Sequence, residues 1–106
     1  MVIIETLIFT KVINTLMQDG EYRSFQNHLL QFPSAGALIQ GSGGIRKIRW
    51  RVGGRGKRGG IRIIYYLADK HDQILMLYAY SKNKQENLTN GQLSILKKVV
   101  ESEFKL

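Results

Sequence analysis

The spacing of apolar residues predicts a strand followed by two helices in the first third of the chain. Residues 2–8 are mostly apolar and β-branched, which is typical of a strand. Residues 9–17 and 22–32 place apolar side chains three and four positions apart, the spacing of amphipathic helices, and Thr10 is the expected cap of the first. Asp19-Gly20 separates these helices and Pro33 ends the second, so they form a helical hairpin.

After a loop of small residues at 34–44, the apolar period becomes two, which predicts a strand at 45–52. One face of this strand is apolar and consists of Ile48, Trp50 and Val52. The other face is cationic and consists of Lys47, Arg49 and Arg51. The alternation favours a core position for Trp50 over a base-stacking role.

The rest of the chain predicts two more strands and a final helix. Strands are expected at 61–67 and 73–81, and their short connection favours antiparallel pairing. Thr89 and Gln92 have the spacing of a capping box that begins the helix. We therefore expect a single α+β domain over residues 1–106, in the order βααβββα. Its mainly antiparallel sheet would carry an N-terminal helical hairpin and a C-terminal helix, with the helices covering one face.

The charge is concentrated in one part of the chain. The sequence has 16 Lys and Arg against 8 Asp and Glu, a net charge of +8, and no acidic residue occurs from 22 to 68. Eight cations lie between residues 44 and 62, namely Arg46, Lys47, Arg49, Arg51, Arg55, Lys57, Arg58 and Arg62. Eight of the eleven glycines lie between residues 41 and 60. This cationic block indicates a polyanionic partner.

Several classes of site are excluded by composition. The chain has no Cys, which excludes disulfides, thiol nucleophiles and zinc fingers. Its two His, at 28 and 71, are too few and too far apart to suggest a metal site. The P-loop pattern GxxxxGK[ST] is absent from the sequence, and the one GxGxxG spacing, at residues 54–59, lies in a loop between two expected strands instead of opening a helix, so a nucleotide-binding site lacks support. The first residues fit neither a signal peptide nor a membrane span, so a cytoplasmic protein is expected. No cofactor and no metal are expected.

The cationic strand suggests binding of a polyanion such as a single-stranded nucleic acid. Its outward cations repeat at about 6.8 Å, which is close to the phosphate spacing of a single strand. Antiparallel pairing would bring Arg62 to the same face. Tyr80, near a strand end and next to Lys82, is a candidate for the site, whereas Tyr78 is more typical of a core residue. A solvated basic face remains the alternative to a polyanion-binding one.

Three segments carry a resemblance to a known family. Gly44–Arg49, Gly59–Tyr66 and Tyr80–Thr89, in this order and spacing, resemble the RelE/HigB family of bacterial toxins. The resemblance implies a RelE-like fold and the toxin half of a type II toxin–antitoxin module. It also implies metal-free endonucleolytic cleavage of mRNA in the ribosomal A site. The implied partners are a cognate antitoxin, the ribosome with its 16S rRNA, mRNA, and operator DNA bound through the antitoxin.

The resemblance and the residue pattern together give candidate site residues. The catalytic candidates are Lys47, Arg49, Arg62, Tyr80 and Lys82. The candidates for RNA and ribosome binding are Arg46, Arg51, Arg55, Lys57, Arg58 and Lys84. The chain has Leu88 or Thr89 where some family members place a catalytic tyrosine. Two alternatives stay open, a non-catalytic RNA- or ribosome-binding inhibitor of translation and a toxin that acts on another target such as DNA gyrase.

Overall fold

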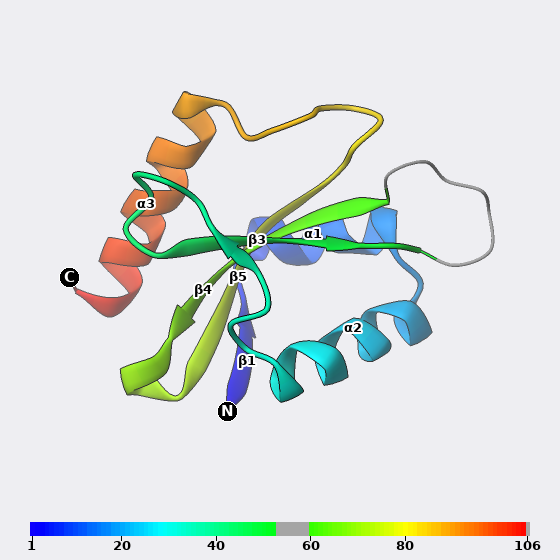
Figure 1. Cartoon of the computed structure of the whole chain (residues 1–106), viewed down its shortest axis with the longest axis horizontal. Helices are drawn as coiled ribbons and strands as arrows, with labels where there is room; N and C mark the ends of the chain where they lie inside the picture. Colours follow the sequence, from blue (N-terminus) through cyan, green and yellow to red (C-terminus); the bar gives the residue numbers. More distant parts are fainter. Residues whose placement is uncertain (53–59, 106) are drawn as a thin grey trace.

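The computed structural model describes residues 1–52 and 60–105 (Figure 1). Its elements, in chain order, are β1 (Val2–Glu5), α1 (Leu7–Leu16), α2 (Asp19–Gln31), β2 (Ala37–Leu38), β3 (Ile45–Trp50), β4 (Ile61–Ala68), the 3₁₀ turn η1 (Asp69–His71), β5 (Gln73–Ser81) and α3 (Asn90–Phe104). The expected α+β fold is confirmed, with its helical hairpin and C-terminal helix. The predicted loop before β3 contains one element that the pattern did not reveal, the two-residue strand β2.

The strands form one sheet in the order β1-β5-β4-β3-β2. All neighbours pair antiparallel except β1, which runs parallel to β5. The helical hairpin and the strands β2, β3 and β4 separate β1 from β5 along the chain, which permits the parallel pairing because a parallel neighbour needs a long crossover connection. The central strands β4 and β5 therefore have a hydrogen-bonded neighbour on each side.

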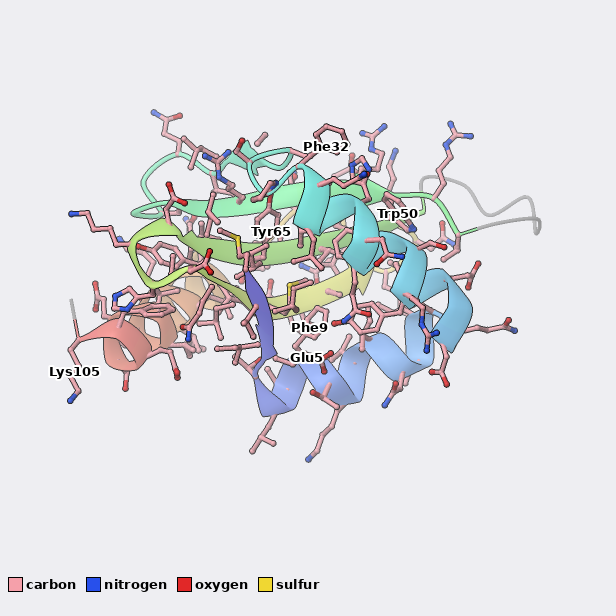
Figure 2. The ribbon with its side chains drawn as sticks, turned by 90° about the horizontal axis from the view of Figure 1, so that it is seen from below. Glu5, Phe9, Phe32, Trp50, Tyr65 and Lys105 are labelled. Carbon is pink, nitrogen blue, oxygen red and sulfur yellow. The ribbon has the colours of Figure 1, made fainter. Side chains whose placement is uncertain are left out.

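The helices cover both faces of the sheet, so the expectation that they cover one face was wrong. One core forms between the sheet and the hairpin α1–α2, and it is visible from the hairpin side in Figure 2. A second core lies on the opposite face, under α3. The physical reason is the apolar run in β4 and β5, whose successive residues Ile63, Ile64, Leu75 and Met76 are all buried. A strand without alternation is typical of a sheet that is covered twice.

Thr6 rather than Thr10 caps α1. The Thr6 hydroxyl accepts a hydrogen bond from the Phe9 backbone N–H (3.1 Å) and donates one to the Leu77 carbonyl of β5 (3.3 Å). Thr10 lies inside the helix, where its hydroxyl donates to the Glu5 carboxylate (2.5 Å). The helix starts earlier than expected because β1 ends at Glu5 and Thr6 already has the extended backbone of an N-cap residue.

The segment after α2 is held against the sheet by Tyr65 and Arg46. The Tyr65 hydroxyl donates to the Pro33 carbonyl (2.7 Å) and accepts from the Gly36 N–H (2.9 Å). A side chain at Gly36 would overlap the Tyr65 ring, with a Cβ only 2.8 Å from it. Arg46 donates to the carbonyls of Ser34 (3.2 Å) and Gly36 (2.7 Å). These contacts position β2 beside β3.

Trp50 packs in the core on the hairpin side, which confirms the prediction from its alternation. Its ring contacts Phe25 edge to face, with ring centroids 5.2 Å apart.

We expect Thr6→Val to lower the free energy of unfolding by about 1–2 kcal/mol. The substitution preserves the shape of the side chain but removes the helix cap and the bond to Leu77. Urea unfolding followed by circular dichroism would measure the loss. Thr15→Val is the matched control, since its exposed hydroxyl only bonds back to the Val12 carbonyl of its own helix. Equal losses in the two variants would contradict the role of Thr6.

A second prediction concerns Tyr22, whose hydroxyl donates to the Glu5 carboxylate (2.6 Å). Burial and the Glu5 carboxylate raise the pKa of Tyr22 well above its usual value. The hydroxyl therefore contributes stability that is present below pH ~10 and is lost as the pH rises further. Tyr22→Phe should cost about 1–2 kcal/mol at pH 7, and the difference from wild type should shrink in urea titrations above pH ~10. A constant difference across this range would contradict the prediction.

Candidate active site

Three candidate residues lie side by side across β3, β4 and β5. Arg49 pairs with Arg62, and Arg62 pairs with Tyr80. Directly paired residues of neighbouring strands point to the same face of a sheet. This face is the one that α3 covers, because Tyr80 belongs to the core under α3. The prediction that pairing brings Arg62 to the face of Lys47 and Arg49 is confirmed.

The same face contains a polar pocket of ≈ 250 Å³. It is lined by Lys47, Arg49, Arg62, Lys82, Glu86 and Asn87. These residues come from β3, from β4 and from the connection between β5 and α3, which runs back from the end of β5 to the start of the helix in Figure 1. We call this feature the cationic pocket. It unites four of the five catalytic candidates, although they are up to 35 positions apart (82 − 47) in the sequence.

Arg62 is the innermost cation of the cationic pocket. Only 5% of its surface is exposed, whereas Arg49 is exposed and Lys47 and Lys82 are half-buried. An arginine stays protonated even in such an environment and presents several N–H donors in a planar fork. Buried Arg62 and exposed Arg49 can therefore each donate hydrogen bonds to a phosphate in the pocket, Arg62 from the inside and Arg49 from the solvent side.

Tyr80 is placed differently from the other catalytic candidates. Its side chain is 4% exposed and it does not line the cationic pocket. Its buried hydroxyl has no hydrogen-bond partner in the part of the chain that is described, although the Leu88 backbone lies near enough to favour the phenolate weakly. Burial raises the pKa of Tyr80, and the Arg62 guanidinium offsets part of this rise. The hydroxyl is therefore protonated at neutral pH, and the side chain is not part of the pocket lining.

Two lining residues, Glu86 and Asn87, were missed by the reasoning from the sequence. The Asn87 side-chain oxygen accepts a hydrogen bond from the Lys47 ammonium (3.3 Å). The Gln85 side chain fixes this segment by donating to the Asn87 carbonyl (2.8 Å) and to the Gln92 side chain (3.0 Å). The segment Tyr80–Thr89, which carries part of the family resemblance, contains both residues. Only the folded connection shows that they lie next to Lys47 and Arg49 of β3.

The described candidates for RNA and ribosome binding do not line the cationic pocket. Arg46 pairs with Tyr65 on the hairpin side of the sheet, where backbone carbonyls hold its guanidinium. Arg51 is exposed just after β3, and Lys84 is exposed in the turn after β5. Three further candidates, Arg55, Lys57 and Arg58, lie outside the described residues.

Comparison with known proteins gives one family. Residues 36–106 match the model of the RelE toxin of the RelE/RelB toxin–antitoxin system. This chain belongs to the RelE toxin family. The matched residues include every residue of the cationic pocket. Membership of this family implies that the chain is a toxin and that its partner is an antitoxin. Toxins of the RelE family are translation-inhibiting endoribonucleases, which is the coarse activity of the class.

A solved structure supports the fold of this RelE-family chain. The free E. coli toxin RelE, determined as a double arginine-to-alanine mutant, superimposes with a TM-score of 0.57. The two sequences are 15% identical, and the match covers 79% of this chain and 85% of the E. coli protein. At this identity the likeness concerns the fold alone. Among the residues described, no helix has the length and apolar character needed to cross a membrane.

The four cations of the pocket predict a salt-dependent affinity for single-stranded RNA. Each phosphate contact contributes about −0.7 to the slope of log K against log salt, so four contacts give a slope of about −2.8 or steeper. Arg49→Gln should make the slope shallower by about 0.7, whereas Lys11→Gln, an exposed position on α1, should leave it unchanged. Fluorescence anisotropy with a labelled oligonucleotide would measure both slopes. Identical slopes for the two variants would exclude the cationic pocket as the RNA site.

Proposed function

We propose that this protein is a ribosome-dependent endoribonuclease that cleaves mRNA in the ribosomal A site and so inhibits translation. The observation that carries the proposal is the convergence of Lys47, Arg49, Arg62 and Lys82 on one pocket. A surface that served only solubility would not need a buried arginine at the centre of its cations, because burying a charge is costly. Membership of the RelE family supports the same class of activity.

The proposed chemistry is an internal transesterification of RNA. The 2′-hydroxyl attacks the adjacent phosphorus, the bond to the 5′-oxygen breaks, and the products carry a 2′,3′-cyclic phosphate and a 5′-hydroxyl. The protein has to orient the 2′-hydroxyl, stabilise the charge of the phosphorane and manage two proton transfers. Arg62 and Arg49 would grip the phosphate oxygens, since arginine binds phosphate with two parallel hydrogen bonds.

The lysines of the cationic pocket have complementary roles in this proposal. Lys47 is held at the pocket by Asn87, and Lys82 follows β5 directly. Their ammonium groups add to the positive potential around the phosphate and can supply a proton to the leaving oxygen. Tyr80 would act from below by filling the space beside Arg62, not by contact with RNA.

The ribosome is the proposed source of binding energy beyond the pocket. The net charge of +8 exceeds what a single scissile phosphate requires. Arg51 and Lys84 are exposed outside the cationic pocket and are proposed to contact 16S rRNA. A cognate antitoxin in the cytoplasm would neutralise the toxin by covering this basic surface, and the complex would bind operator DNA through the antitoxin.

The central test is the substitution Arg62→Ala in a purified translation system with a defined mRNA. We expect cleavage to fall by about 100-fold or more, because one positioned donor to a developing oxyanion contributes at least this factor. Primer extension with and without ribosomes, in the presence of chelator, would locate the cuts. Wild type should produce new 5′ ends in A-site codons only when ribosomes are present.

Two further variants separate chemistry from folding. Arg49→Ala changes an exposed cation of the same pocket, so it should reduce cleavage without unfolding the protein. Arg23→Ala changes an exposed arginine of α2 and serves as the control with the same loss of charge. Translation arrest by wild type without new 5′ ends would favour the non-catalytic inhibitor. Arrest of replication with intact translation would favour a target such as gyrase.

A further inference from the structure

The cationic pocket contains one carboxylate, that of Glu86. The lining does not include the other seven acidic residues of the sequence, namely Glu5, Asp19, Glu21, Asp69, Asp72, Glu101 and Glu103. Glu86 is thus the single acid placed among Lys47, Arg49, Arg62 and Lys82. A lone carboxylate reduces the affinity of such a pocket for phosphate, so its position calls for a chemical role.

The Glu86 carboxylate is exposed. Within residues 1–52 and 60–105, the one ion pair closer than 4 Å joins the N-terminus to Asp72 (3.5 Å) at the far end of the sheet. The backbone on both sides of Glu86 is nevertheless fixed. Gln85 bonds to the Asn87 carbonyl and to Gln92, and Thr89 caps α3. Glu86 is therefore held at the pocket with its acceptor oxygens available to a ligand.

Metal-free transesterification needs an acceptor for the 2′-hydroxyl proton, and the other groups at this site are poor acceptors. Lysine and arginine side chains are protonated at neutral pH as a class, whereas carboxyl groups are ionised. Tyr80 is buried, has a raised pKa and does not line the pocket. Among the side chains that line the pocket, the Glu86 carboxylate is therefore the best acceptor for the proton of the 2′-hydroxyl.

We propose that Glu86 is the general base of the reaction, which rests on the proposed endoribonuclease function. The proton of the 2′-hydroxyl passes to the Glu86 carboxylate as the 2′-oxygen bonds to phosphorus. The bond from phosphorus to the 5′-oxygen breaks, and that oxygen takes a proton from a lysine of the cationic pocket. The neighbouring cations stabilise the phosphorane and also attract the substrate phosphate toward Glu86. Asn87 is a positioning residue that holds Lys47 beside it.

The test is Glu86→Gln, compared with Glu103→Gln, which makes the same charge change at an exposed position of α3. Single-turnover cleavage on programmed ribosomes should be slowed about 100- to 10,000-fold by Glu86→Gln, as expected for loss of a general base. The affinity for RNA should stay equal or increase, because a negative charge has left a cationic pocket. A purely structural role for Glu86 would instead weaken binding and cleavage together.

A substrate with sulfur in place of the leaving 5′-oxygen separates the base from the acid. A thiolate leaves without protonation, so this RNA should restore cleavage to a variant that lacks the proton donor, such as Lys82→Ala. It should not restore cleavage to Glu86→Gln, whose defect lies in activating the 2′-hydroxyl. Rescue of Glu86→Gln, or full activity of this variant on normal RNA, would overturn the assignment. Failure of wild type to cleave would overturn the proposed function and this role with it.

Discussion

One extra residue in β5 decides which side chains of this strand lie on the same face of the sheet as the cationic pocket. Tyr65 pairs with Met76, but the next residue of β4, Ile64, pairs with Tyr78, so Leu77 forms a β-bulge. Without it, the register that begins at Tyr65 would place Ala79 opposite Arg62. A shift of one residue moves every following side chain to the other face. Tyr80 would then point toward the helical hairpin, away from Arg62.

The bulge is stabilised from outside the antiparallel part of the sheet. Bulged residues leave backbone groups without a regular ladder partner. Thr6 meets this need, because its hydroxyl donates to the Leu77 carbonyl and its N–H donates to the Met76 carbonyl (3.1 Å). Thr6 also caps α1. The start of the helical hairpin is thereby coupled to the register of the site face, through one short polar residue.

The sequence was informative where a pattern is local and repetitive. Alternation in 45–52 identified β3, its apolar Trp50 face and its cationic face, and strand pairing then implied the position of Arg62. The bulge left no such signal, because Leu77 and Tyr78 both continue an apolar run that fits either register. Glu86 was equally hidden, since its neighbours in the pocket lie on other strands. Only the fold of the connection over β3 brings it there.

The burial of Arg62 and Tyr80 gives the pocket its electrostatic character. Both side chains are about 95% buried, and Tyr80 is the strand partner of Arg62, so little water reaches the guanidinium. The attraction between a cation and a phosphate grows as water is removed from around them. An exposed arginine such as Arg49 can attract RNA but is well screened by solvent. Arg62 is the cation whose interaction with a developing negative charge is screened least, and the bulge at Leu77 is what places the Tyr80 ring beside it.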